Sequence, residues 1–129
     1  MSNVTISHST KTYPNLPYTQ IKDAILGKKY SLSLVFIGAK RAQRLNIDHR
    51  NKAYIPDVLS FPLDENTGEI YICLPRVAAT AHKYSHSPLF HTGFLFIHGL
   101  LHLKGYRHGA TMEGMEQKYC KRFLTKNTD

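Results

Sequence analysis

Three histidines in the last third of the chain have the spacing of a metal site. His98 and His102 are four residues apart, which places both imidazoles on one face of an α-helix, one turn apart. Gly105 can end that helix through a left-handed conformation, so His108 can return toward the same point. Two nitrogens from a helix and one from the following turn make three corners of a tetrahedron. A catalytic zinc uses this arrangement and keeps its fourth position for water or substrate.

The residue after the first histidine argues against one familiar chemistry. The spacing matches the zinc-peptidase signature His-Glu-x-x-His-x-x-Gly-x-x-His, in which the glutamate is the general base. Gly99 occupies that position and cannot accept a proton, and it is expected to leave space near the metal. A zinc peptidase stays open as an alternative without its base. A closed structural zinc, with Cys73 or Cys120 as fourth ligand, is another alternative, although such sites usually use closely spaced cysteine pairs.

The composition of the chain predicts one domain with an anionic partner. The 129 residues are enough for a single modest core, so residues 1–129 are expected to form one domain. Lysine and arginine number 17 against 9 acidic residues, which favours nucleic acid first and a membrane surface second. The two cysteines indicate no disulfide framework and suit a reducing cytoplasm. Residues 1–10 are too polar for a signal peptide, and no apolar run is long enough to span a membrane.

The elements that must position the histidines alternate between helical and extended patterns. We expect strands at 30–37, 57–61 and 69–74, a weak edge strand or loose arm at 4–6, and helices at 18–26, 40–49, 76–84, 89–104 and 111–124. The last two strands flank a turn cluster at 64–68 and should form a hairpin. This order predicts an α+β fold, a small sheet with helices packed on it.

The helix at 89–104 is expected to be central and buried. Ser87 can cap it and Pro88 can fill its first position. It is apolar nearly all round from Phe94 to Leu103, the pattern of a helix surrounded by protein. His91 lies two turns before His98 and is interpreted as a hydrogen-bonded core or groove histidine. The remaining histidines are expected in solvent: His8, His49, His82 and His86.

An open zinc on a basic protein predicts hydrolysis of an anionic substrate. Zinc lowers the pKa of bound water to about 7, so the nucleophile needs no protein base. A phosphodiester also needs its developing negative charge neutralised, which the planar donor fork of an arginine can do. Spacing alone does not choose among the arginines. Candidates for contacts with a nucleic-acid backbone lie on the basic helix, where a merely solvated helix face is the alternative: Lys40, Arg41 and Arg44.

The motifs together resemble the YbeY family of bacterial endoribonucleases and ribosomal-RNA maturation factors. Residues 98–108, HGLLHLKGYRH, are similar to the family pattern His-Gly-x-Leu-His-Leu-x-Gly-Tyr-Asp-His. A second block contains Leu45-Asn46, then Arg50, then residues 57–62, DVLSFP. A third is residues 68–73, GEIYIC, where the family usually has Gly-Asp-Ile. The similarity runs in the same order through about residues 30 to 124.

The resemblance implies a compact α+β fold with a small mixed sheet and a zincin-like core around a buried, metal-bearing helix. It implies one zinc ion per chain, held by His98, His102 and His108, and a functional role for Arg50. The implied activity is cleavage of single-stranded RNA in small-subunit ribosomal RNA 3′-end maturation and ribosome quality control. The expected partners are ribosomal RNA and the small ribosomal subunit. No membrane and no small organic cofactor are expected, and the expected location is the cytoplasm.

Three departures from the family pattern concern the surroundings of the site. Arg107 replaces the acidic residue that usually precedes the last histidine, so the carboxylate that orients a ligand histidine could be missing. Ala53 and Ile55-Pro56 replace the usual Asp and Pro-Thr stretch, and Glu69 replaces an Asp. An RNA- or ribosome-binding assembly factor with a mainly structural metal is the alternative function.

Overall fold

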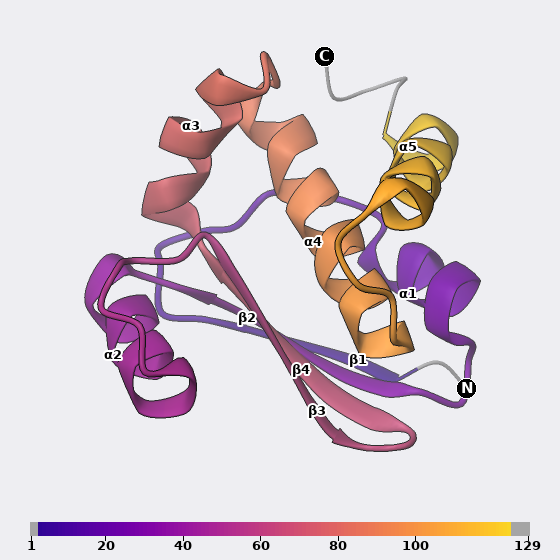
Figure 1. Cartoon of the computed structure of the whole chain (residues 1–129), viewed down its shortest axis with the longest axis horizontal. Helices are drawn as coiled ribbons and strands as arrows, with labels where there is room; N and C mark the ends of the chain where they lie inside the picture. Colours follow the sequence, from indigo (N-terminus) through magenta and orange to yellow (C-terminus); the bar gives the residue numbers. More distant parts are fainter. Residues whose placement is uncertain (1–2, 125–129) are drawn as a thin grey trace.

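The computed structural model describes residues 3–124 as one layer of sheet covered by helices (Figure 1). A single α+β domain with a small mixed sheet, as predicted, is confirmed over these residues. Along the chain the elements are β1 (Asn3–His8), α1 (Tyr18–Leu26), β2 (Ser31–Ile37), α2 (Ala39–Arg50), β3 (Val58–Asp64), β4 (Thr67–Cys73), α3 (Leu74–Lys83), α4 (Pro88–Lys104) and α5 (Ala110–Phe123).

The sheet has the strand order β1-β2-β4-β3 and mixes both pairing directions. β2 pairs in parallel with β1 and with β4, while β3 and β4 form an antiparallel hairpin. β2 is therefore interior, as its apolar sequence predicts, and residues 4–6 belong to a true edge strand. The other edge is β3, which tolerates Pro62 because an edge strand has backbone N–H groups without ladder partners. The turn of this hairpin is shorter than predicted, because β3 extends to Asp64 and β4 begins at Thr67.

The long helix α4 lies at the centre of the fold. It contacts β3 and β4 of the sheet together with α1, α3 and α5 (Figure 1). Its apolar side chains Phe96, Ile97, Leu100 and Leu101 have no exposed surface. A helix that is apolar nearly all round needs such surroundings, since each face must be removed from water. The position of α4 therefore fixes the histidines that it carries relative to the sheet and α5.

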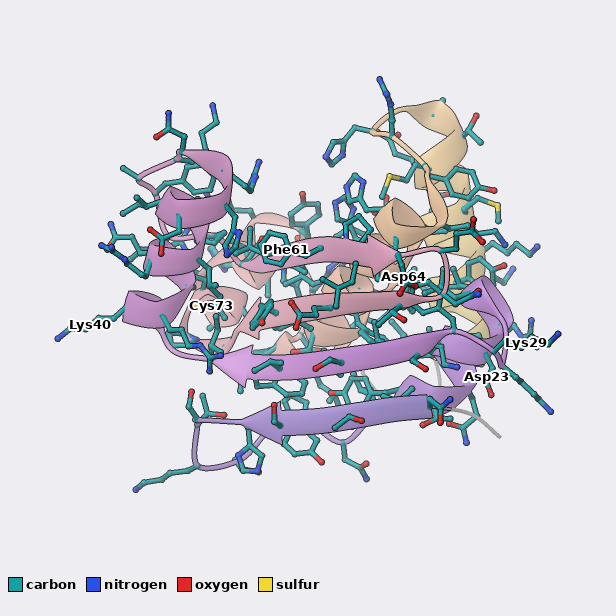
Figure 2. All side chains as sticks on the ribbon, turned by 90° about the horizontal axis from the view of Figure 1, so that it is seen from below. Asp23, Lys29, Lys40, Phe61, Asp64 and Cys73 are labelled. Atoms are coloured by element: carbon teal, nitrogen blue, oxygen red, sulfur yellow. The ribbon has the colours of Figure 1, made fainter. Side chains whose placement is uncertain are left out.

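The opposite face of the sheet is covered mainly at one end by α2. There Val35, Ile37, Ala42 and Cys73 form a small second core. Figure 2 looks onto this face, with α2 at one end of the strands and Cys73 beneath it. β2 alternates between the two cores, since Leu34 and Phe36 face the larger cluster under α4. Among residues 3–124, no helix is both long and apolar enough to cross a membrane.

Candidate metal centre and adjoining cavity

The two ends of α4 explain how its histidines are aimed. Ser87 Oγ accepts a hydrogen bond from Phe90 N, and Pro88 occupies the first turn, so the helix begins where the sequence predicts. It ends at Gly105, whose φ of 112° is a conformation that residues with a side chain rarely adopt. The backbone N–H of Tyr106 then bonds back to Leu101 O at 3.0 Å. This closure turns the chain back toward the helix.

His98, His102 and His108 come together at this turn, and we call them the histidine triad. One nitrogen of each lies within 4.8 Å of the others. The ring centroids are 4.5 Å apart for His98 and His102, and 5.0 and 4.7 Å from these to His108. The two helical members are half-buried and His108 is exposed. The structure therefore brings together the three histidines that the sequence singled out.

Hydrogen bonds on the far side of each helical imidazole fix its tautomer. His98 Nδ1 donates to Glu116 Oε2 at 2.5 Å, and His102 Nδ1 donates to Tyr106 O at 3.1 Å. Both Nε2 atoms then carry lone pairs, yet they face each other at 3.0 Å. Burial, and next the neighbouring His98, lower the pKa of His102, which keeps its ring neutral. Two lone pairs at this separation repel unless a cation lies between them.

The triad fits a metal ion that prefers nitrogen ligands. Tetrahedral zinc with Zn–N bonds of about 2.0–2.1 Å separates two nitrogens by roughly 3.3 Å, close to the 3.0 Å between His98 Nε2 and His102 Nε2. Glu116 and the Tyr106 carbonyl are the type of partner that orients a metal-binding imidazole. The donor set of three imidazoles leaves a coordination position for another ligand. The geometry thus shows that the three histidines could bind a metal, and the choice of metal rests on the donor chemistry.

Neither cysteine belongs to this group of ligand atoms. Cys73 is buried in the second core beneath α2, on the other face of the sheet from α4. Cys120 is buried on α5, and burial, with a contribution from Glu116, raises the pKa of its thiol to about 12. Its thiol is not among the ligand atoms that lie within 4.8 Å of one another at the triad. The arrangement does not favour the closed structural zinc with a cysteine ligand.

A cavity of about 660 Å³ opens beside the triad. His98 and His108 contribute to its wall, together with Glu116 of α5. The rest of the lining comes from the start of β3, the α3–α4 turn, α4 and α5. Its volume lies in the range of about 300–1,000 Å³ that is usual for ligand pockets. A ligand in the cavity would therefore lie next to a metal held by the histidines.

Gly99 is required by packing against the sheet. A Cβ atom on Gly99 would lie 2.8 Å from Ser60 Oγ and 3.1 Å from Ile70 Cδ1. Ser60 Oγ also donates to Gly99 O at 3.1 Å, which joins α4 to β3. The expectation that Gly99 leaves space near the metal is therefore wrong. The residue has no side chain because α4 approaches β3 and β4 closely at this point.

Arg50 is held at the end of α2 and is not among the residues that line the cavity. Its Nη1 donates to Asn46 Oδ1 at 3.1 Å and to Tyr54 Oη at 3.0 Å. Asn46 is itself fully buried and donates to Tyr54 O, so the guanidinium rests on an ordered support. The structure does not place Arg50 in contact with the triad. Its interactions leave further N–H donors of the guanidinium for an anion.

The basic side chains of α2 lie on its outer surface. Lys40 points away from the rest of the molecule (Figure 2). Arg41 lies over the ring of Tyr71 with its guanidinium carbon 5.7 Å from the centroid, and Arg44 pairs with Asp48 at 3.3 Å. Lys40 therefore differs from Arg41, which packs on an aromatic ring, and from Arg44, which pairs with a carboxylate. The group lies on a different element from the triad.

A second group of histidines lies near the other end of the cavity, and we call His86 and His91 the histidine pair. Their Nδ1 atoms are 3.0 Å apart, and His91 Nε2 is 3.0 Å from Thr80 Oγ1. His91 has no exposed surface, as predicted for a hydrogen-bonded core histidine. Burial, with a smaller effect of His86, lowers the pKa of His91 to about 4. The prediction that His86 is solvated is wrong, because its ring packs among those of Tyr84, Phe90 and Phe94.

Glu116 and His86 are the residues that sequence reasoning missed. Glu116 is 7% exposed and supplies a carboxylate beside His98, so the replacement of the acidic residue by Arg107 does not leave this imidazole without one. One signal was available, because Glu116 follows Met112 by four residues and precedes Tyr119 by three, both on the buried face of α5. A carboxylate on such a face requires a partner. His86 precedes α4 in a turn, where periodicity gives no information.

The described part of the chain matches known proteins along nearly its whole length. The family model described as "Endoribonuclease YbeY" matches residues 3–124. A protein of Mesoplasma florum named Endoribonuclease YbeY is 37% identical over 105 residues, which are 73% of this chain and 62% of that protein. A protein of the same name from Ureaplasma parvum is 39% identical over 102 residues, 70% of this chain and 66% of its own length. The chain therefore spans less than two thirds of the length of these relatives.

A solved structure supports the fold independently. The solution structure of the Thermotoga maritima protein TM1509 superimposes with a TM-score of 0.63 and 23% sequence identity. The match covers 92% of this chain and 87% of that protein. At this identity the likeness concerns the fold alone.

Proposed function

The chain belongs to the endoribonuclease YbeY family, and on that premise we propose that it is a metal-dependent endoribonuclease. The observation that carries the proposal is the histidine triad, in which one ring nitrogen of each histidine lies within 4.8 Å of the others, while Glu116 and Tyr106 hold the Nδ1 atoms of His98 and His102. The proposed metal is one zinc ion bound by His98, His102 and His108. The proposed substrate is single-stranded RNA, in agreement with the formal charge of +8.

The residues of the site divide the chemistry between them. When bound, a zinc ion supplies a Lewis acid that stabilises negative charge and acidifies water. Glu116 accepts the Nδ1–H of His98 and keeps the imidazole in the tautomer that offers Nε2. Arg50 is proposed to bind a phosphate of the substrate through guanidinium donors that Asn46 and Tyr54 leave available. Lys40, Arg41 and Arg44 are proposed to contact neighbouring phosphates.

Membership of the family supports a proposal for the finer biological role. We propose that the substrate is the small-subunit ribosomal RNA precursor near its 3′ end, with a role in ribosome quality control. The small ribosomal subunit is the proposed partner, and this partner would place the protein in the cytoplasm. An assembly factor with a mainly structural metal is the competing function, because Arg50 does not line the cavity beside the triad. A zinc peptidase is not favoured, since Gly99 supplies no base and its position has no room for one.

The test combines metal analysis with an RNA-cleavage assay on wild type, His102→Ala and Arg50→Ala. Wild type is expected to carry about one metal ion per chain and to cut single-stranded RNA. His102→Ala should lose both properties. Arg50→Ala should keep its metal and lose activity by about 10²-fold or more, the usual cost of removing a donor that stabilises transition-state charge.

Three outcomes would contradict the proposal. Full metal content and activity in His102→Ala would reject the ligand assignment. If no variant cleaves RNA while wild type and Arg50→Ala bind it equally, the assembly-factor function is supported instead. Peptide cleavage that disappears in His98→Ala would revive the peptidase.

A further inference from the structure

The cavity beside the triad has an aromatic wall that the proposed chemistry leaves unexplained. Tyr84 is 56% exposed, and its ring centroid lies 5.4 Å from those of both His86 and Phe94. Phe90 adds to the wall, with its centroid 4.7 Å from His86. Tyr84 and His86 lie in the turn between α3 and α4, and Phe90 and Phe94 lie in the first half of α4. The large ring of Tyr84 therefore remains in contact with solvent, although it also packs against the rings of His86 and Phe94.

This wall is continuous with the triad. The ring of Phe94 contacts Tyr84 on one side and lies 6.3 Å, centroid to centroid, from His98 on the other. Tyr84, Phe94 and His98 all line the same cavity. A flat ligand stacked on the wall would therefore lie directly beside the position where a metal is proposed to bind.

The charges around the cavity select the part of a nucleotide that could enter it. Asp57, Glu113 and Glu116 line it, together with the single cation Lys121. Three carboxylates repel a phosphate, but they accept hydrogen bonds from the amino and ring N–H groups of adenine, cytosine and guanine. The concentrated positive charge lies elsewhere, on α2 at Lys40, Arg41 and Arg44. An aromatic wall with an acidic rim is thus complementary to a base and not to the backbone.

From these observations we infer that the cavity binds one unpaired base of the RNA, stacked on Tyr84 and Phe94, next to the bond that is cut. The inference rests on the proposed function for the identity of the polymer. It also supplies a physical reason for a preference for single strands, because a base in a duplex cannot leave its stack without a cost. An amino-bearing base is favoured over uracil by the carboxylates of the rim.

The first test is an abasic scan of a fluorescent single-stranded RNA against the wild-type protein. Binding is measured by anisotropy while the base is removed at one position after another. Removing the stacked base should weaken binding about tenfold, the typical scale for one base on an aromatic platform, and removal elsewhere should change it little. Replacing the favoured base by uracil should give a smaller loss. A flat profile overturns the inference.

The second test removes the wall. Tyr84→Ala should weaken binding of the intact RNA about tenfold. It should not further weaken binding of the RNA that lacks the stacked base, because that RNA has already lost the contact with Tyr84. Tyr84→Phe keeps the ring and should bind like wild type. Leu63→Ala is the matched control, since Leu63 is an apolar side chain of similar exposure (59%) outside the cavity. Equal losses in Tyr84→Ala and Leu63→Ala would overturn the inference.

Cleavage of the same RNAs separates this inference from the proposed function. Triad-dependent cleavage with a flat abasic profile rejects the base pocket and leaves the nuclease. A sharp profile that Tyr84→Ala erases, without cleavage by any variant, supports the pocket and rejects the nuclease. Displacement of RNA by a peptide with an aromatic side chain, together with a flat profile, would assign the cavity to a protein chain and reject the base pocket.

Discussion

The histidine triad and the histidine pair each bring imidazole nitrogens together, but the hydrogen-bond partners of these rings differ. In both groups two ring nitrogens face each other at 3.0 Å. In the pair, Thr80 Oγ1 donates to Arg76 O at 2.9 Å and so accepts the Nε2–H of His91. The Nδ1 of His91 is then the acceptor for His86 Nδ1–H, and the contact is an ordinary hydrogen bond. In the triad, Glu116 and Tyr106 take the Nδ1 protons of His98 and His102, so that in the neutral rings both facing Nε2 atoms are acceptors.

The difference shows that the partner of the second nitrogen decides what a buried histidine can do. A carboxylate or carbonyl takes the proton of one nitrogen and leaves the other as a ligand, as Glu116 and Tyr106 do. In the pair, the Thr80 hydroxyl accepts from one nitrogen of His91, and His86 donates to the other. Both nitrogens of His91 are then hydrogen-bonded, and neither is left as a metal ligand. The comparison therefore predicts a metal at the triad and pH-sensitive stability at the pair.

The largest effect is expected from removing a triad member. His108→Ala should lower the affinity for zinc by more than about 100-fold, because even loss of an orienting partner costs 10–100-fold. His108 is exposed, so the fold should not suffer. His91→Gln, in the pair, should keep the affinity of wild type. Competition with a chromophoric chelator measures both variants, and equal losses would erase the distinction between the two groups.

The pH dependence of stability should report the pair. Burial, and less strongly His86, lower the pKa of His91 in the folded state to about 4, against about 6.5 in the unfolded chain. Above pH 6.5 neither state binds the proton, and the contribution to stability is complete. As the pH falls toward 4, His91 binds a proton in the unfolded chain but stays largely unprotonated in the folded protein. The free energy of unfolding should therefore fall by an amount on the order of 3 kcal/mol.

Denaturant titrations of wild type and His91→Gln, both with a chelator present, isolate this contribution. The variant should be less stable at pH 7 and should show a flatter profile between pH 6.5 and 4. All other ionisable groups are shared by the two proteins, so their contributions cancel in the comparison. Parallel profiles would show that His91 does not carry the pH dependence.

The partner of His98 should have an intermediate effect. Glu116→Ala should weaken zinc binding by about 10–100-fold, since the imidazole loses the acceptor that fixes its tautomer. Glu116→Gln retains an oxygen acceptor and should lose less. Glu113→Gln, also on α5 and beside the cavity, is the control for a change of charge without loss of this contact. If Glu113→Gln lowers the affinity as much as Glu116→Ala, the effect is one of net charge alone.

The parts of this arrangement that the sequence predicts are those set by local geometry. The convergence of the triad follows from the helical period and from the left-handed conformation at Gly105. The ends of α4 follow in the same way from Ser87 and Pro88. The sheet is predicted as strands, but its order and its parallel pairings depend on contacts between distant segments. No local pattern contains that information.

The surroundings of the triad are harder to predict from the sequence for the same reason. Glu116 is 18 positions from His98, and only its place on the buried face of α5 indicates that it needs a partner. Gly99 was interpreted from a peptidase signature, while its true constraint is the approach of α4 to Ser60 and Ile70. Arg50 was identified by family resemblance, and its bonds to Asn46 and Tyr54 are local to the end of α2.

The smallest effect is expected at Thr80, whose hydroxyl oxygen accepts the hydrogen bond from His91 Nε2. Thr80→Val keeps the shape of the side chain but leaves the buried Nε2–H of His91 without its acceptor, which should cost about 1–3 kcal/mol of stability. Thr80→Ser restores the hydroxyl and should recover most of that loss. Zinc affinity should be the same in all three proteins, because Thr80 contacts the pair and not the triad. Thermal unfolding and chelator competition on one set of samples give both quantities. If zinc affinity falls in Thr80→Val and recovers in Thr80→Ser, the pair and the triad are coupled through α4. The two groups would then form one network, and the contrast between them would be rejected.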